Sequence, residues 1–357
     1  MEDQVGPQRM SSPSLFFIIG RPRSGTTLLR FLFEAHPGVL VPPESPFILN
    51  LYRKYRNVTS WNPETIREFC DDVYTQRYFE KWLTDKEHLY QQLMEKEGRS
   101  SFQTMVRQVC LSYNSVFEKD DIRWIGDKNP GYSLYVHRIH QLFPEAKIIH
   151  ITRDYRDNYL SLTKVNFEVP VVPLVVFRWK FALKRMWELK KHVPEQIFSI
   201  RYEDLVADPE HHFRDICRFI GIPYDPDVLS FYRKKSAIEK AYAGSDEIQQ
   251  VHQSLFHPIS TRRINLWKSE MRAREIRIAD LVAGKAAEKA GYERQYTRFN
   301  IGLYLWILPT LIYAWVMYQL ILLGDRMPHK LRNGLNRFLG IFLKSYWKFH
   351  KRKIKPL

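Results

Sequence analysis

FFIIGRPRSGTTLLR, residues Phe16 to Arg30, is the stretch that decides the fold. Four apolar residues lead into Gly20, and Gly25 opens a run that can be helical. This pattern predicts a buried strand, a tight loop and the N-terminus of a helix. The N–H groups of such a loop and the positive end of the helix dipole converge on one point, where they bind an anion. The stretch therefore predicts a phosphate-binding loop at the end of a strand.

This loop differs at one position from the loop of a nucleotide triphosphatase. Its spacing from Gly20 to Gly25 matches GxxxxGK[ST], but Thr26 stands where the phosphate-binding lysine is expected. The cation is instead Arg23, whose planar guanidinium suits an oxyanion with several equivalent oxygens. We find no clear magnesium-binding aspartate after a strand, which also argues against a kinase or NTPase, the alternative enzyme class. The loop favours a phosphate or phosphosulfate ligand.

The composition describes a large, basic and aromatic-rich chain. Its 357 residues suffice for two average domains or one large α/β domain with additions, and a core of that size needs no disulfide or metal. The net charge of +16 favours a nucleotide, a nucleic acid or an acidic membrane surface as partner, although a solvated basic surface explains it equally well. Three separated cysteines without CxxC spacing indicate free thiols in a reducing compartment: Cys70, Cys110 and Cys217. Residues 1–14 are polar and predict a disordered N-terminus, with no visible signal peptide or N-terminal anchor.

Strand and helix patterns alternate along the chain, which predicts an α/β fold with a P-loop-type parallel sheet flanked by helices. Further strands are expected at 147–152 and 197–202, a turn at 127–131, and helices ending near Phe143, covering about 174–191, and running from Asp208 to Gly221. Parallel sheets bind ligands at the carboxyl ends of their strands. Arg23, Arg153 and Tyr202 each stand at such an end.

The segment at about 47–120 predicts helices with many aromatic residues. These residues line an acceptor pocket or, as is commoner at helical spacing, form the core. They are Phe47, Tyr52, Tyr55, Trp61, Phe69, Tyr74, Tyr78, Phe79, Trp82 and Tyr90.

The C-terminal part predicts a membrane-binding segment. Ile301 to Gly324 contains no charged residue, has tryptophan and tyrosine near both ends and is long enough to span a bilayer. From Asp325 onward, ten lysines and arginines stand against one aspartate. The apolar residues of this basic tail fall on one helical face: Leu331, Leu335, Phe338, Leu339, Phe342, Tyr346 and Phe349.

Two placements of this segment follow. Residues 301–323 span the membrane and leave the basic tail outside, or they form a re-entrant or interfacial helix, bent at Pro309, that enters from the cytoplasmic side. The positive-inside tendency favours the second placement, with the basic amphipathic helix on the same face. A buried dimer helix of a soluble protein is the third alternative.

Two motifs together identify a family. PRSGTTL, from Pro22 to Leu28, resembles the 5′-phosphosulfate loop of sulfotransferases that use 3′-phosphoadenosine 5′-phosphosulfate, and RDYRDNYLS, from Arg153 to Ser161, resembles their 3′-phosphate site. The second motif needs an arginine at a strand end and a serine two helical turns later, so that both meet one phosphate. The motif spacing is most similar to the tyrosylprotein, membrane-type branch, and the resemblance covers roughly residues 15–295.

The resemblance implies the donor-binding residues. They are Arg23, Ser24, Gly25, Thr26 and Thr27 of the loop, Arg153 and Ser161 of the second motif, and Tyr202, which matches a tyrosine near the adenosine. Residues 257–271 resemble the late loop that closes over the nucleotide, with Ser260, Arg262, Arg263 and Lys268 as candidates. This loop departs most from the family pattern because it lacks the glycine-rich sequence of the cytosolic branch. The alternative is that these residues form the basic edge of a helix and do not bind the nucleotide.

The resemblance also implies catalytic residues. Arg23 and Lys128 are expected to stabilise the charge that gathers on the transferred oxygens and the leaving phosphate. Glu44 follows Arg23 by 21 residues, the spacing of the catalytic glutamate in the tyrosylprotein branch, and is expected to take the acceptor's proton in a partly desolvated site. The cytosolic branch uses a histidine as the base, so three histidines are alternatives to Glu44: His137, His140 and His150. A structural role is the simpler explanation for each of them. No metal is expected.

We therefore expect one sulfotransferase domain over residues 15–298, with a helical acceptor-binding insertion at about 47–120. A hydrophobic helix and a basic amphipathic helix follow over 299–357. The expected reaction moves a sulfuryl group to a hydroxyl of a lipid-like or membrane-borne acceptor such as a sterol, glycolipid or glycan; a protein tyrosine or soluble carbohydrate is the alternative acceptor. An inactive membrane scaffold is the alternative from another class.

The expected partners are the nucleotide donor, the hydroxyl acceptor and a membrane contacted through residues 301–350. No nucleic acid is expected, and a homodimer is left open. The catalytic domain is expected to be cytoplasmic and membrane-associated.

Overall fold

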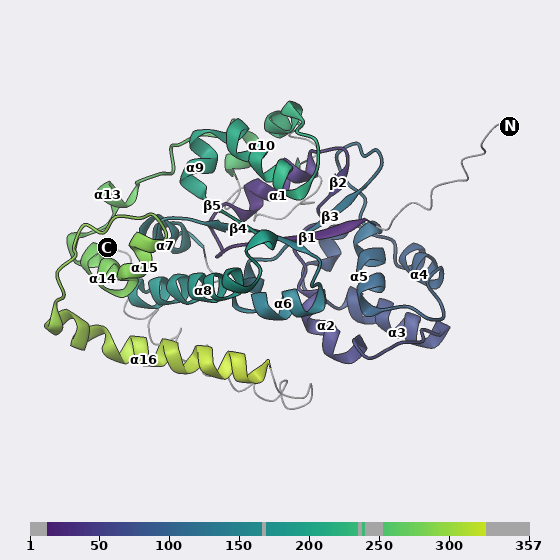
Figure 1. The fold of residues 1–357 in the computed structure, drawn as a ribbon, viewed down its shortest axis with the longest axis horizontal. Coiled ribbons are helices and arrows are strands. Elements are labelled where there is room, and N and C mark those ends of the chain that lie inside the picture. Colours follow the sequence, from purple (N-terminus) through teal and green to yellow (C-terminus); the bar gives the residue numbers. More distant parts are fainter. Residues whose placement is uncertain (1–12, 166–168, 235–237, 240–252, 326–357) are drawn as a thin grey trace.

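The computed structural model describes residues 13–165, 169–234, 238–239 and 253–325. Within them, five parallel strands form one sheet in the order β2-β3-β1-β4-β5 (Figure 1). The strands are β1 (Ser14–Ile19), β2 (Val39–Leu40), β3 (Trp124–Lys128), β4 (Lys147–Thr152) and β5 (Ile197–Arg201). The predicted parallel sheet flanked by helices is confirmed. The predicted disordered N-terminus and basic amphipathic helix lie outside the described residues, apart from Pro13, Ser14 and Asp325.

Alternating side chains of the central strand β1 enter two different cores. Leu15, Phe17 and Ile19 pack into the core on one face of the sheet, and Phe16 and Ile18 pack into the core on the other. All five side chains are buried, as expected for a parallel strand covered on both faces. This double burial explains the continuous apolar run before Gly20.

Helices cover both faces of the sheet (Figure 1). One face carries α1 (Thr26–Glu34), α9 (Tyr202–Ala207) and α10 (Pro209–Ile220), and the other carries α2 (Phe47–Tyr55), α6 (Val136–Leu142) and α8 (Val172–His192). The other described helices are α3 (Pro63–Tyr74), α4 (Lys86–Met94), α5 (Phe102–Leu111), α7 (Tyr155–Thr163), α13 (Trp267–Glu270), α14 (Ala273–Ala283), α15 (Lys285–Lys289) and α16 (Ile301–Gly324). Short 3₁₀ turns are η1 (Phe79–Trp82), η2 (Pro130–Leu134), η3 (Pro194–Gln196), η4 (Pro226–Arg233) and η5 (Gln253–Phe256).

The predicted turn at 127–131 is wrong at its first two positions. Asp127 and Lys128 end β3, which pairs with β1 on one side and β2 on the other. A Cβ at Gly126 would lie 2.5 Å from Cζ of Phe16, so the β3 backbone packs directly against that ring. Local preferences of Gly, Asp and Lys disfavour a strand, but pairing with two neighbours overrides them.

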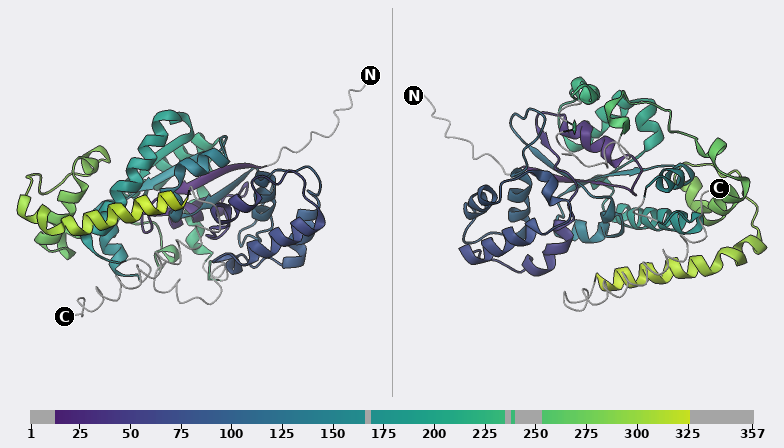
Figure 2. Two further views of the ribbon diagram at one scale, coloured as in Figure 1. Left: turned by 90° about the horizontal axis from the view of Figure 1, so that it is seen from below. Right: turned by 180° about the vertical axis from the view of Figure 1, so that it is seen from behind.

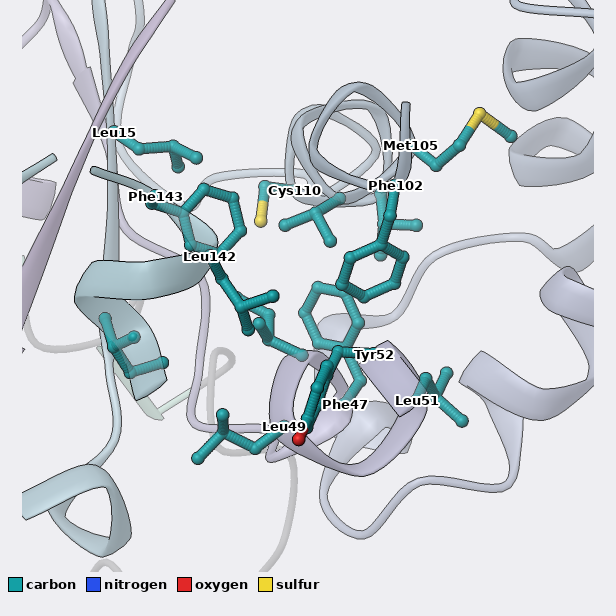
Figure 3. Packing of buried hydrophobic residues seen from close by; sticks show 14 of the residues in the cluster. Leu15, Phe47, Leu49, Leu51, Tyr52, Phe102, Met105, Cys110, Leu142 and Phe143 are labelled. Carbon is teal, nitrogen blue, oxygen red and sulfur yellow. The ribbon is translucent and has the colours of Figure 1, made fainter. Parts of the chain in front are cut away.

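The aromatic residues of the helical segment mostly form core. Figure 3 shows Phe47, Tyr52 and Phe102 packed together near Leu15 and Phe143. Of the ten aromatic residues named from the sequence, seven are buried: Phe47, Tyr52, Tyr55, Trp61, Phe69, Phe79 and Trp82. Their burial supports the core interpretation over an aromatic-lined pocket.

Helix α16 lies along the domain instead of projecting from it (Figures 1 and 2). The ring of Tyr318 packs 4.8 Å from that of Phe181 on α8. Beyond the end of α16, Asp325 forms ion pairs with Arg138 at 3.1 Å and Arg53 at 3.9 Å. The helix is therefore docked along α8 and held at its C-terminal end.

Candidate active site

Three strand ends meet at one edge of the sheet. The register pairs Ile18 of β1 with Lys128 of β3, and Ile19 of β1 with His150 of β4. The loop that follows β1 therefore lies beside the carboxyl ends of β3 and β4. Arg23, Lys128 and Arg153 share this edge; the sequence predicts a strand end for Arg23 and Arg153 but a turn for Lys128.

The loop after β1 has a left-handed backbone at two positions. Arg23 has a φ of 66° and Gly25 a φ of 96°. A Cβ at Gly25 would lie 2.5 Å from Cδ2 of Tyr202, so the tyrosine ring rests on the loop. No described side chain caps the N-terminus of α1, which begins at Thr26. Its first N–H groups therefore face the pocket as anion donors.

A pocket of about 270 Å³ opens over this loop. Ten residues of the sequence-based set line it: Arg23, Gly25, Thr26, Thr27, Arg153, Ser161, Tyr202, Ser260, Arg262 and Arg263. Sequence reasoning missed the others: Leu28, Val206, Leu255, His257, Pro258 and Ile259. Among these described lining residues are four arginines and no carboxylate. The pocket is built for an anion.

Three of the arginines converge. Arg153 donates from Nη1 to the carbonyl oxygen of Arg23 at 3.2 Å and from Nη2 to that of Arg263 at 2.6 Å. Burial, together with the charges of Arg263 and Arg153, lowers the pKa of Arg23 to about 10. Nε of Arg153 is buried without a hydrogen-bond partner among the described residues. A bound anion would relieve the repulsion between the arginine charges and would accept a hydrogen bond from Nε of Arg153.

The two sequence motifs touch each other. Nε of Arg23 donates to Oγ of Ser161 at 3.0 Å, and the Arg153 guanidinium lies 4.8 Å from the centre of the Tyr202 ring. Asn158, on the same helix as Ser161, donates to the carbonyl oxygen of Pro22 at 2.8 Å. Helix α7 thus holds the loop that follows β1.

The second motif also holds the late loop. Asp157 accepts hydrogen bonds from the backbone N–H groups of Asn265 and Trp267, at 2.7 and 2.9 Å. Sequence reasoning did not single out Asp157 or Asn158. The four-residue spacing of Asp157 and Ser161 was the available signal for Asp157, because it places both on one face of α7.

Two predicted donor-binding residues do not line this pocket. Ser24 is fully buried, and its Oγ accepts from Asn158 at 3.3 Å. Lys268 lines a neighbouring cleft with Asp154 and Arg294. The hydroxyl of Ser24 therefore connects the loop to Asn158 of α7. The structure gives no contact between Lys268 and the pocket.

Glu44 and Lys128 form an ion pair at the same edge of the sheet. Nζ of Lys128 donates to Oε2 of Glu44 at 2.8 Å. The lysine side chain is 8% exposed and that of the glutamate 34% exposed, so the carboxylate can reach solvent or an acceptor. This partial burial agrees with the partly desolvated site expected for Glu44.

The loop that carries Glu44 is held at both ends. Before it, Nε of Arg30 donates to the carbonyl oxygens of Val41 and Pro42 at 3.0 and 3.1 Å, and Glu34 accepts from the N–H of Val41. After it, Nδ2 of Asn129 donates to the carbonyl oxygen of Ser45 at 2.8 Å. Arg30, Glu34 and Asn129 were not singled out from the sequence, because a buried clamp of this kind has no motif. The helix that follows the phosphate-binding loop thus positions the Glu44 loop as well.

A second carboxyl group lies beneath this pair. Burial raises the pKa of Asp127 to about 7, although a hydrogen bond from Asn129 at 3.3 Å acts in the opposite direction. The charge of Glu44 also raises it. Asp127 is therefore the described carboxyl beside Glu44 that can hold a proton near neutral pH.

None of the three rival histidines lines the pocket. His150 is buried in β4 beside Trp179 and Met186, and burial lowers its pKa to about 4. His137 and His140 lie on α6, and Nε2 of His137 is 3.9 Å from Glu188. The geometry favours Glu44 over these histidines. Within the described ranges, no group of three or more histidine, cysteine, aspartate or glutamate side chains is arranged to hold a metal ion.

Fold and site together define a class: a parallel α/β enzyme with an anion-binding loop at the sheet edge. The chain belongs to the sulfotransferase family, whose family model matches residues 13–226. The family resemblance drawn from PRSGTTL and RDYRDNYLS is thereby confirmed, and so is the enzyme class.

Known proteins similar to the chain agree with this assignment. Over 273 residues it is 22% identical to protein-tyrosine sulfotransferase 1 of Danio rerio, covering 73% of this chain and 69% of the relative. It is 24% identical to protein-tyrosine sulfotransferase of Drosophila melanogaster, covering 72% of this chain but only 47% of the relative. The sulfotransferase domain of the Synechococcus PCC 7002 olefin synthase has the same fold, with a TM-score of 0.52 and 21% identity over 80% of this chain and 98% of that domain.

Proposed function

We propose that this chain transfers a sulfuryl group from 3′-phosphoadenosine 5′-phosphosulfate to an acceptor hydroxyl. The observation that carries the proposal is the pocket in which Arg23, Arg153 and Arg263 converge with no carboxylate among its described lining residues. The Glu44–Lys128 pair lies at the same edge of the sheet. Like charges at such short range are costly unless an anion binds between them. A donor with separate phosphate and phosphosulfate groups matches a pocket with two anion-binding elements.

The residues present fit that donor. The loop N–H groups and Arg23 would hold the phosphosulfate, whereas Arg153, Ser161 and Arg263 would hold the other phosphate. The unpartnered Nε of Arg153 provides an unused donor for it. When bound, the nucleotide supplies a sulfuryl group on a good leaving group. Because magnesium is not needed to complete this cationic site, we propose metal-independent binding.

The two residues of the Glu44–Lys128 pair would have different roles in the reaction. Glu44 would accept the proton of the attacking hydroxyl, and Lys128 would place its charge on the oxygens where negative charge develops. Their 2.8 Å contact in the structure holds both side chains close to the sheet edge. We retain Arg23 as the third catalytic candidate, since its guanidinium lies in the loop itself.

Two classes of acceptor are supported by different observations. The relatives named protein-tyrosine sulfotransferase support the phenolic hydroxyl of a protein tyrosine, which we take as the first candidate. The exposed apolar face of α16 favours a lipid-like or membrane-borne hydroxyl as the second. We propose a cytoplasmic catalytic domain over residues 15–298, supported by the positive-inside tendency of the basic tail.

Nucleotide binding tests the donor assignment. Adenosine 3′,5′-bisphosphate should bind equally well with EDTA and with magnesium, and Arg153→Lys should weaken binding by roughly ten-fold or more, because lysine keeps the charge but loses the planar fork. The exposed Arg99→Lys is the matched control. Magnesium-dependent binding, or tighter binding of ATP, would favour the kinase or NTPase alternative.

Transfer of labelled sulfate tests the reaction and the acceptor. Purified protein with ³⁵S-labelled donor is offered a tyrosine-containing acidic peptide in one arm and a membrane lipid extract in another. Label in the peptide, recovered as tyrosine sulfate, supports the first candidate, and label in the lipid fraction supports the second. Nucleotide binding without transfer in any arm, a soluble glycan included, would instead support the inactive scaffold.

A further inference from the structure

Helix α16 presents an uncovered apolar face. Its 24 residues have a mean hydropathy of 1.7 over the most apolar window, but only 28% of that window is buried. The large side chains left exposed are Ile301, Leu305, Trp306, Ile312, Trp315, Val316 and Leu323. Apolar surface of this extent on one helix indicates an interaction site.

The opposite face of α16 is docked on the domain throughout its length. Ile307 and Ala314 are buried against the core, and Tyr318 packs against Phe177 and Phe181. The N-terminus is capped by Asn300, and Asp325 is ion-paired beyond the C-terminus. A helix docked on this face can contact a bilayer only with its uncovered face. It cannot be surrounded by lipid, as a spanning helix is, without leaving these contacts.

Cations border the exposed face. The guanidinium of Arg274 lies 4.5 Å from the centre of the Trp306 ring. Lys180 and Lys184 line a groove of about 510 Å³ between α8, α14 and α16, whose other walls are mainly apolar. Burial and the charge of Lys184 both lower the pKa of Lys180. An anionic group bound at the groove would raise this pKa again.

We infer that the exposed face of α16, with its bordering groove, docks the protein onto an anionic lipid bilayer with the helix axis in the membrane plane. Tryptophan at an apolar face beside lysine and arginine matches the interfacial region of such a bilayer. The ten lysines and arginines that follow Asp325 in the sequence add to the attraction of the chain for acidic headgroups.

A bilayer fits this face better than two other occupants. A second copy of the chain would bring another +16 charge and a second basic tail against the same cations. The chain's own tail carries the same sign of charge and would meet Arg274, Lys180 and Lys184. The inference does not depend on the acceptor and holds whether or not the donor assignment is correct.

Depth measurements distinguish docking in the plane from spanning. Leu305 and Ile312 are exposed and seven positions apart, which is close to two full helical turns, so they lie on the same side of α16. Their depths would differ by about 10 Å in a helix along the membrane normal and would be nearly equal in a helix in the plane. The native cysteines Cys70, Cys110 and Cys217 are buried, so nitroxide labels attach selectively to Leu305→Cys or Ile312→Cys. Power-saturation EPR on the full chain, with vesicles of phosphatidylcholine and phosphatidylserine, reports the depth of each label.

We expect both labels at the same shallow depth, and a label at Leu83→Cys, 54% exposed in the helical segment, to stay aqueous. Depths that differ by about the helical rise between the two positions would overturn docking in the plane in favour of spanning. Immobile labels shielded from lipid would overturn it in favour of a second copy or the tail.

Vesicle sedimentation gives a second test. Trp306→Ser with Trp315→Ser should weaken binding to acidic vesicles by roughly ten-fold or more, whereas Leu83→Ser should not. Lys184→Glu should weaken it about five-fold, and Arg218→Glu on α10, across the sheet, should have a much smaller effect. Unchanged nucleotide binding verifies folding of each variant. Equal binding of the wild type and the double tryptophan variant would refute the inference.

Discussion

At the scale of single residues, the Glu44–Lys128 pair places the proposed base beside a buried cation. A carboxylate removes a proton from a hydroxyl only when it is held at the reacting atom, and the 2.8 Å contact with Lys128 provides that restraint. Burial and the charge of Glu44 raise the pKa of Asp127, whereas the charge of the same lysine lowers it.

Replacing Glu44 tests its role as the base. Glu44→Gln keeps the size of the side chain and an oxygen facing Lys128 but removes the base, so transfer should slow by roughly 10² to 10⁴. Binding of adenosine 3′,5′-bisphosphate should stay unchanged, because Glu44 is outside the arginine pocket. Steady-state transfer and calorimetry measure the two quantities. The exposed Glu64→Gln is the control, and near-normal turnover of Glu44→Gln would show that another group takes the proton.

Asp127 predicts a pH dependence of stability. Its pKa in the folded protein, about 7, lies above the ordinary value of 3.8, so the folded state holds a proton that the unfolded state releases. Stability from this group is present below about pH 4 and is lost as the pH rises to about 7.

Asp127→Asn should remove that loss. The free energy of unfolding of the variant should rise relative to that of the wild type from pH 4 to pH 8, by up to a few kcal/mol at about 1.4 kcal/mol per pKa unit. The difference in melting temperature should grow in favour of the variant over the same range. Thermal unfolding across this range measures it. A constant difference across the range would show that Asp127 titrates normally. Comparing the two proteins cancels the contributions of the other buried carboxyls.

At the scale of elements, β3 links the phosphate-binding loop to the Glu44 loop. It pairs with β1 in register, and the residue after it, Asn129, donates to the backbone of Ser45. Since α1 holds the other end of the same loop through Arg30, the proposed donor-binding loop and the loop of the proposed base share one support.

Removing the Asn129 contact should affect catalysis more than binding. Asn129→Ala frees one end of the Glu44 loop and leaves the carbonyl oxygen of Ser45 unpaired, at a stability cost of about 1–3 kcal/mol. We expect kcat to fall by roughly ten-fold or more, with little change in nucleotide affinity, because small displacements of a catalytic group are expensive. Asn129→Asp, which loses the donor but keeps the shape, should resemble Asn129→Ala. A melting temperature that falls with normal kcat would restrict Asn129 to a structural role.

Strand and motif positions were predictable where local sequence and burial agree. Lys147 to Thr152 forms β4 at the predicted bounds, and the helix after Asp208 ends at Gly221, whose φ is 92°. β3 was missed because its backbone pairs on both sides while its residues favour a turn. Ser24 and Lys268 show the corresponding limit for the site: a motif places residues in a segment, but only packing decides which side chains face the pocket.

At the scale of the whole molecule, the position of α16 could not be inferred from its composition. An uncharged run of this length fits a spanning helix and an interfacial one equally, since both need only apolar residues. The contacts of Tyr318 and Asp325 with the domain distinguish the two, and they involve residues far away in the sequence.

The ion pairs of Asp325 should hold the C-terminal half of α16 on the domain. Its carboxylate is 14% exposed and faces Arg138 and Arg53, so Asp325→Asn leaves two half-buried cations without their partner. Because partly exposed ion pairs contribute about 1 kcal/mol, amide exchange over residues 312–324 should accelerate about five-fold, while the sheet remains unchanged. Hydrogen–deuterium exchange with mass spectrometry resolves this segment.

The matched control for this prediction is Asp121→Asn, which removes an exposed pair with Arg123. It should change exchange nowhere in α16. Equal exchange in the wild type and Asp325→Asn would mean that the aromatic contacts of Tyr318 alone dock the helix. A faster exchange that vesicles suppress would show that lipid and the domain hold opposite faces of the same helix, which requires α16 to lie in the membrane plane.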